Sequence, residues 1–369
     1  MSAALPPSSQ PDTLLAVQYL RAAAAVAVVF YHISVLSQKT WGLDPERIDH
    51  VAAAGVDLFF VISGFIMAMI VARSAGFNGK DFWIRRVARV VPAYWVITFV
   101  VFALALKMPQ LFNSTTADLY SLFASLSFLA LEQGDGSTTP LLVVGWTLNY
   151  EIFFYAIVAL TAGLFGDRKL MGTSAALICL VAAGVLFGPD SGALAFYSDP
   201  ILLEFVFGIL IFQSWSQSRG RDRGRGPGLV PIAVFTAGLL LLALQWERPV
   251  GEWRALFWGV PAAAVLYGGL SVLTFRSAVL ARLGEWSYAL YLTHVFVVTF
   301  YIKHAISTVT TIALPWQLHY LIITGVAVLA AAAYHYAVEA PLSRWSLRML
   351  RGSGPVAGVD LPLTANRSR

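Results

Sequence analysis

Blocks of mostly apolar residues, each bounded by polar or charged positions, recur along the whole chain. They lie near 14–36, 54–72, 90–107, 143–165, 171–187, 198–212, 229–245, 255–273, 286–302 and 318–338. Most of them approach the roughly 20 apolar residues that an α-helix needs to cross a bilayer. Only helices and closed barrels satisfy their own backbone within lipid. The pattern therefore predicts an all-α polytopic membrane protein, a bundle of about ten transmembrane helices.

Composition supports this class. The chain has 369 residues, of which 58% are hydrophobic and 12% charged, and its mean hydropathy is +0.71. Soluble domains carry about 25% charged residues, so a soluble protein is excluded. We expect one membrane domain at 14–345, a disordered leader at 1–13 and a basic cytoplasmic tail at 346–369. Cys179 is the only cysteine, which excludes an intrachain disulfide and a thiol-based metal site.

The distribution of positive charge predicts the orientation. With the N-terminus inside, the inner connections carry eighteen Lys and Arg and the outer ones carry six. This asymmetry follows the positive-inside rule and places both termini in the cytoplasm. A further apolar stretch at 117–131 would invert the later helices if it crossed, so we expect a re-entrant or interfacial segment on the outer side. The Arg- and Gly-rich loop at 220–228 is interpreted as a topology signal rather than a nucleic-acid site.

Two polar residues inside the first apolar block are the strongest clue to function. Arg21 and His32 are eleven residues apart, which on an α-helix is close to three turns and roughly 16 Å of rise. Titratable groups at membrane depth are costly and commonly mark functional sites. We therefore expect both side chains on one face of the helix, at two positions along one path through the interior of the bundle.

Two carboxylates also lie at membrane depth. Asp57 opens the second block from the outer side, where it either orients the imidazole of His32 or caps its own helix. Glu151 lies in the fourth block, and a carboxylate there needs an Arg, a His or a water-filled cavity as its partner. That partnership is either functional or a buried structural pair.

The block at 286–302 carries a polar stripe. Ser287, Tyr291 and His294 are spaced by four and then three residues, so they share one face of the helix. Counted from the cytoplasmic side, His294 reaches the depth of Arg21 or slightly beyond it. The stripe is either functional or a set of satisfied structural side chains.

Three arginines stand just before the third block, at Arg85, Arg86 and Arg89. Guanidinium groups match the oxygens of phosphate groups. However, a juxtamembrane basic cluster also serves topology and contacts anionic lipids, and the spacing alone favours this second interpretation. Glu339 closes the last helix at its cytoplasmic end, where a salt bridge to this cluster is expected.

Several familiar chemistries have no counterpart in the sequence. The chain has no nucleophile elbow of the Gly-x-Ser-x-Gly type, no phosphate-binding Walker loop and no His-Glu-x-x-His zinc motif. The sequence therefore predicts no metal site and no permanently bound cofactor.

Six short blocks resemble a known family in the family's own order. These are Leu20-Arg21 with Tyr31-His32, then GVDLFFVISGF at 55–65, RRVARVVPAYW at 85–95, WTLNYEIFFY at 146–155, GEWSYALYLTH at 284–294 and EAP at 339–341. Together they resemble the membrane acyltransferase family 3 proteins over about 14–345. The form VGWTLNYE at 144–151 is most similar to the branch that modifies exopolysaccharides.

The resemblance implies an integral O-acyltransferase of the bacterial inner membrane. Such proteins move an acyl group, usually acetyl, from cytoplasmic acyl-coenzyme A to a sugar hydroxyl of a surface glycan or its lipid-linked precursor. The family's essential Arg and His match Arg21 and His32, and its Arg-x-x-Arg donor motif matches Arg86 and Arg89. Acetyl-coenzyme A is then a donor substrate, and the expected partners are this donor, a glycan acceptor and membrane lipids.

The roles that follow are expectations. His32 would act as general base on the sugar hydroxyl, or carry the acyl group itself in a ping-pong variant. Asp57 or Glu151 would orient His32, and Arg21 or a tyrosine would stabilise developing negative charge. Arg86 and Arg89, with Arg85 beside them, would hold the donor. The supporting residues are Ser63, Tyr291, His294 and Glu339.

A different class of protein is also compatible with buried charges. A transporter or flippase for a glycan or lipid intermediate would use Arg, Glu and His to line a substrate or proton path. The absence of an internal repeat and the arginine cluster in register with Arg21 argue against it. The sequence leaves open which sugar hydroxyl is modified, which acyl group is moved, and the oligomeric state.

Overall fold

The computed structural model describes residues 10–41, 48–74, 76–108, 118–132, 136–188, 192–218, 228–244, 253–305 and 314–351. Within these ranges every regular element is helical, so the all-α prediction is confirmed for them. Helix α1 begins at Gln10, so the last residues of the leader expected at 1–13 are helical. Helix α16 continues to Arg351 and includes the start of the tail expected at 346–369. Residues 1–9, 352–369 and most of the loop at 220–228 lie outside the described residues.

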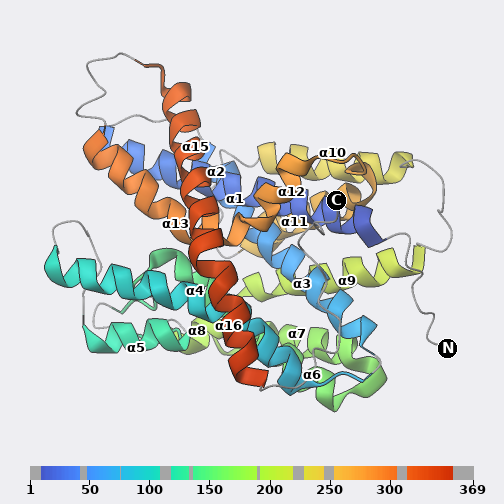
Figure 1. Ribbon diagram of the computed structural model, residues 1–369. Coiled ribbons are helices and arrows are strands. Elements are labelled where there is room, and N and C mark those ends of the chain that lie inside the picture. Colours follow the sequence, from blue (N-terminus) through green and yellow to red (C-terminus); the bar gives the residue numbers. More distant parts are fainter. Residues whose placement is uncertain are drawn as a thin grey trace.

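The long helices form a bundle whose members run back and forth across the molecule (Figure 1). They are α1 (Gln10–Trp41), α3 (Gly55–Arg73), α4 (Gly79–Lys107), α6 (Trp146–Leu164), α7 (Lys169–Phe187), α9 (Leu203–Ser218), α11 (Val260–Val272, preceded by the π-helix Ala255–Gly259) and α15 (Trp316–Tyr334), which continues through a π-helix (His335–Glu339) into α16 (Ala340–Arg351). The shorter helices are α2 (Ile48–Ala53), α5 (Leu119–Ser127), α8 (Gly192–Tyr197), α10 (Leu229–Leu244), α12 (Ala278–Glu285) and α13 (Ser287–Phe300).

Eight helical segments in the described part of the chain are long and apolar enough to cross a membrane. They coincide with eight of the ten expected crossings, which makes the chain a multi-pass membrane protein. The remaining two expected crossings, 229–245 and 286–302, correspond to α10 and α13, of 16 and 14 residues. The count of ten and the cytoplasmic placement of both termini stay predictions.

The segment at 117–131 forms no crossing in the described residues. Helix α5 has nine residues, about 14 Å of rise, which is less than half of a bilayer core. The carboxylate of Asp118 caps its first turn by accepting a hydrogen bond from the backbone N–H of Ser121 at 2.8 Å. The indole of Trp95 on α4 donates to the carbonyl of Leu126 at 2.9 Å and ties the segment to the bundle. A re-entrant or interfacial position therefore remains the expectation.

The third crossing begins much earlier than its apolar block predicts. The side chain of Asn78 accepts a hydrogen bond from the backbone N–H of Asp81 at 3.1 Å and starts α4 at Gly79. Pro92 lies inside this helix without ending it. The arginines at 85–89, expected at the cytoplasmic end of this helix, therefore lie more than one turn inside it, in its first half.

Helix α3 is the centre of the bundle. It is apolar on nearly all sides, and 78% of its most apolar stretch is buried. The corresponding share is 22% for the segment that contains α7 and for the segment from α15 through α16. A helix that is hydrophobic all round belongs in the interior. Its closest neighbour is α9, where Gly64 and Gly208 let the two backbones touch: a Cβ atom at Gly64 would lie 2.1 Å from the carbonyl oxygen of Phe205. A Cβ at Gly208 would lie 2.1 Å from that of Val61.

Replacing either glycine of this crossing should separate α3 from α9. Gly64→Ala and Gly208→Ala should each lower the free energy of unfolding by about 1–3 kcal/mol, because the added methyl group meets backbone that cannot rotate away. Thermal unfolding of the detergent-solubilised protein measures the loss. Gly163→Ala on α6 is the matched control, since a Cβ there has no neighbour within 4 Å. Equal unfolding temperatures for all three variants would contradict the proposed crossing.

Candidate active site

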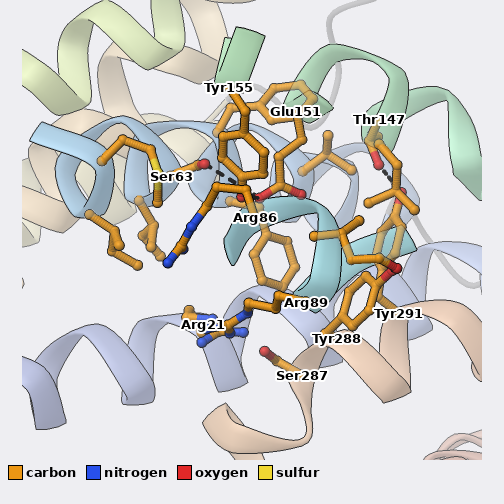
Figure 2. A pocket seen from close by; sticks show the side chains of 18 residues that line it. Arg21, Ser63, Arg86, Arg89, Thr147, Glu151, Tyr155, Ser287, Tyr288 and Tyr291 are labelled. Atoms are coloured by element: carbon orange, nitrogen blue, oxygen red, sulfur yellow. Dashed lines mark hydrogen bonds between the residues drawn. The ribbon is translucent and has the colours of Figure 1, made fainter. Parts of the chain in front are cut away.

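A cavity lies among α1, α3, α4, α6 and α13, and Figure 2 shows the side chains that line it. Its walls enclose about 830 Å³, part of which is open to solvent. The polar residues of the lining are Arg21, Ser63, Arg86, Arg89, Thr147, Glu151, Tyr155, Ser287, Tyr288 and Tyr291, and most of the apolar ones come from α3. We call this space the central cavity.

Three guanidinium groups converge on the central cavity (Figure 2). Arg86 and Arg89 are three residues apart on α4 and therefore share one face of that helix, while Arg21 comes from α1. Within the described residues, none of the three forms a salt bridge with a carboxylate. The Nε of Arg86 is buried without a hydrogen-bond acceptor in that part of the chain. The cavity thus offers positive charge and unused donors to a ligand.

Arg85 is directed elsewhere. Its Nε donates to the carboxylate of Asp81 at 2.9 Å, one turn earlier on α4, and Arg85 is not part of the cavity lining. Asp81 also pairs with Arg351 at the end of α16, at 2.8 Å. The expected donor cluster of three arginines is therefore divided: two face the cavity, and the third pairs with Asp81, the residue that joins α4 to α16.

Glu151 is the carboxylate of the central cavity. The hydroxyl of Tyr155, one turn later on α6, donates to its Oε1. The hydroxyl of Ser63 on α3 donates to the same oxygen at 3.5 Å. Arg21 and Arg86 lie close enough to Glu151 for electrostatic attraction without direct pairing. The sequence predicts an Arg, a His or a water-filled cavity beside this carboxylate. The structure places two arginines near it and a cavity around it.

Two tyrosines of α13 line the central cavity and are held there by hydrogen bonds. Tyr288 donates to the carbonyl of Val90 on α4 at 2.8 Å. Tyr291 donates to the carbonyl of Val144 at 2.8 Å, and its oxygen lies 2.6 Å from the hydroxyl of Thr147. These bonds join α13 to α4 and to the start of α6. Two members of the predicted polar stripe, Ser287 and Tyr291, therefore face the site, whereas the third, His294, does not line it.

His32 lies beside His294 rather than in the lining of the central cavity. The Nε2 of His294 is 3.2 Å from the Nδ1 of His32, and the two ring centroids are 4.8 Å apart. His294 is fully buried, and its ring centroid is 6.0 Å from that of Tyr291, which does line the cavity. Arg21 and His32 share one uninterrupted helix and both face α13, as their spacing predicts.

The expected depth of His294 is wrong. Ser287, the first residue of α13, lies beside Arg21 in the cavity lining, so α13 begins inside the bundle. The preceding helix α12, which packs against α1, carries the chain to that depth. Seven residues beyond Ser287, about 10 Å along the helix, His294 therefore reaches the level of His32 rather than that of Arg21.

Neither carboxylate orients His32. Asp57, fully buried on α3, accepts two hydrogen bonds of 2.9 Å from the Nε and Nη2 of Arg254. It does not cap its helix either: the N-cap position of α3 is Ala54, which makes no side-chain cap hydrogen bond. Glu151 is engaged by Ser63 and Tyr155 as described above. Both expected roles of Asp57 are thus replaced by an ion pair with Arg254.

Glu339 also has a different partner from the one expected. Its Oε2 lies 2.9 Å from the Nδ1 of His335, one turn earlier in the π-helix. The Nε2 of His335 lies 3.6 Å from Glu285 on α12. A near neighbour on the same helix thus replaces the arginines of α4, and the expected salt bridge to that cluster is wrong.

Comparison with known proteins decides the family. The sequence pattern of an acyltransferase domain, that of acyltransferase family 3, matches residues 14–336. The chain belongs to this family. It is 33% identical to the exopolysaccharide production protein ExoZ of Rhizobium meliloti (strain 1021), over 80% of this chain and 90% of that protein. No solved structure matches it.

Two further relatives are named as acyltransferases. The acyltransferase MdmB of Streptomyces mycarofaciens is 29% identical over 94% of each chain. A Bacillus subtilis (strain 168) protein, YrhL, is 26% identical over 89% of this chain and 55% of its own length, and its name designates a candidate peptidoglycan O-acetyltransferase. Membership of the family makes this chain a membrane-bound O-acyltransferase.

Sequence reasoning missed one ionic cluster in this acyltransferase. Arg254 was counted only as a charge of an outer loop, yet its guanidinium lies 5.6 Å and 4.9 Å from the ring centroids of Trp146 and Trp258 and binds Asp57. Glu204 on α9 is fully buried nearby. Two signals existed in the sequence, because Asp57 and Glu204 are both acidic residues inside predicted apolar blocks, but neither indicates that the cation lies at Arg254, 197 residues from Asp57.

Removing the guanidinium of this cluster should destabilise the fold. Arg254→Ala leaves the buried carboxylate of Asp57 unpaired, which costs about 3–5 kcal/mol, so the unfolding temperature should fall clearly. The double variant Asp57→Asn with Arg254→Ala should recover part of the loss, because it removes the unpaired charge. Arg344→Ala, at an exposed arginine of α16, is the control. An unchanged unfolding temperature for Arg254→Ala would refute the ion pair.

Proposed function

We propose that this acyltransferase moves an acyl group, in the first instance acetyl, from acyl-coenzyme A to a sugar hydroxyl. The acceptor is an exopolysaccharide or another surface glycan precursor. One observation supports the donor most directly: three guanidinium groups that form no salt bridge with a carboxylate among the described residues surround a cavity within an apolar bundle. With Glu151 as the single carboxylate of the lining, the site keeps an excess of positive charge that suits an anionic ligand.

The donor fits the distribution of charge. Coenzyme A carries phosphate groups at one end and a thioester at the other, joined by a long flexible arm. Arg86 and Arg89 would bind the phosphates at the mouth expected to face the cytoplasm, and the unused Nε of Arg86 and hydroxyl of Ser287 would be satisfied there. Ser63 and Tyr155 hold Glu151 near these arginines, so it would set their orientation without neutralising all three.

The arm would then extend past Arg21 toward His32, roughly 16 Å farther along α1. His32 would take the proton of the sugar hydroxyl at a ring nitrogen as the sugar oxygen bonds to the thioester carbon. The carbon–sulfur bond breaks, and the leaving thiolate takes the proton from His32. Arg21 would stabilise negative charge on the carbonyl oxygen or on sulfur. A ping-pong route would place the acyl group on His32 before transfer.

The acceptor assignment rests on the relatives. ExoZ is named for exopolysaccharide production and covers most of this chain, so a sugar of a secreted or surface polysaccharide is the acceptor we favour. The cellular site that goes with it is a bacterial inner membrane. A transporter without chemistry of its own is the second candidate considered above, and family membership argues against it.

The first experiment measures coenzyme A release from acetyl-coenzyme A by the purified protein in liposomes with cell-envelope glycan as acceptor. His32→Ala should lower turnover at least about 100-fold, because the general base is lost. Arg86→Ala should raise the dissociation constant for acetyl-coenzyme A about 10- to 100-fold, since charge-assisted bonds to phosphate are lost. Arg344→Ala, on the exposed side of α16, is the matched arginine control and should change neither quantity.

Two results would contradict this proposal. Near-normal transfer by His32→Ala would exclude both the base and the acyl-histidine route. Failure of the wild-type protein to bind acetyl-coenzyme A, together with no thiol release for any envelope fraction, would favour a transporter.

A further inference from the structure

Two histidines from distant parts of the chain meet inside the bundle. His32 on α1 and His294 on α13 are 262 residues apart in sequence, yet their nitrogens Nδ1 and Nε2 are 3.2 Å apart. His294 is fully buried and does not line the central cavity. It therefore cannot be explained as a contact to the donor in that cavity.

Backbone carbonyls determine which nitrogen of each ring carries hydrogen. The Nδ1 of His294 lies 2.9 Å from the carbonyl oxygen of Leu290, and the Nδ1 of His32 lies 2.9 Å from that of Val28. A carbonyl oxygen only accepts hydrogen bonds, so both Nδ1 atoms are donors. In a neutral imidazole the other nitrogen then holds a lone pair. The Nε2 of His294 is consequently an acceptor directed at the Nδ1–H of His32.

This arrangement leaves the Nε2 of His32 as the nitrogen that receives a proton. Its Nδ1–H is shared between the carbonyl of Val28 and the Nε2 of His294, so the ring is held in one tautomer. When Nε2 becomes protonated, the positive charge spreads over the ring, and both acceptors of Nδ1–H stabilise it. His294 thus occupies the place that a carboxylate takes in many catalytic pairs.

We propose that His294 is a positioning residue for His32: as a neutral acceptor, it fixes the tautomer and orientation of the catalytic imidazole. Two observations explain why a histidine has this role. Asp57, the carboxylate expected beside His32, is held by Arg254. Beside a neutral imidazole in this apolar setting, an unpaired carboxylate would be costly to bury, whereas a neutral ring accepts a hydrogen bond without adding charge. The inference rests on the proposed function of His32.

The test compares His294→Phe with His294→Gln in the assay of coenzyme A release. Phe keeps a ring of similar size and removes the acceptor, so kcat should fall at least about tenfold while KM for acetyl-coenzyme A stays within about twofold. Gln offers a carbonyl oxygen to the Nδ1–H of His32 and should recover most of kcat. His319→Phe, at a histidine of α15 whose Nδ1 lies 3.0 Å from the hydroxyl of Tyr301 and which does not line the central cavity, is the matched control and should leave kcat unchanged.

Each outcome decides the proposal. Wild-type kcat for His294→Phe, or a Gln variant no more active than the Phe variant, would overturn it, since a space-filling role is better served by Phe. Unfolding temperature and acetyl-coenzyme A binding are measured for each variant. If the Phe variant fails to fold, the Gln variant decides alone: a folded His294→Gln protein with kcat tenfold below wild type overturns the positioning role. Activity retained by His32→Ala would instead overturn the proposed function, and this inference with it.

Discussion

Burying positive charge in an apolar helix bundle is the constraint on which this structure depends. Arg21, Arg86 and Arg89 surround the central cavity without forming a salt bridge in the described residues, and Glu151 is the one carboxylate of the lining. Such groups are costly at membrane depth and persist where a cavity, water or a ligand supplies the missing interactions. This arrangement supports the proposal that the cavity binds an anionic donor.

The rest of the bundle holds these groups in place. Close contact of α3 and α9 at Gly64 and Gly208 builds a rigid centre beside the cavity. Hydrogen bonds from Tyr288 and Tyr291 fix α13 against α4 and α6, which places Ser287 at the cavity and His294 beside His32. The charges that do not serve the cavity are paired elsewhere, as in the bidentate contact of Arg254 with Asp57.

Much of this architecture could be predicted from the sequence. Apolar block length predicts the crossings, and the eleven-residue interval predicts that Arg21 and His32 share a face of one helix. The three-residue interval between Arg86 and Arg89 likewise explains why both reach the cavity while Arg85 does not. The resemblance to acyltransferase family 3 is confirmed over residues 14–336.

Contacts between residues far apart in the sequence could not be predicted in this way, because hydrophobic periodicity describes one helix at a time. Nothing in the sequence indicates that Asp57 meets Arg254, or that α13 begins inside the bundle and carries His294 to His32. The partner of Glu339 was within reach: His335 is four residues earlier and so lies on the same helical face. In the prediction, the more distant arginine cluster was preferred over this local signal.

The most direct test of the central claim is an experimental structure of the protein with a non-hydrolysable acetyl-coenzyme A analogue. The account predicts that the phosphates contact Arg86 and Arg89 and that the thioester end lies beyond Arg21 toward His32. Coenzyme A bound outside the central cavity, or bound there with its acyl end directed away from His32, would contradict it.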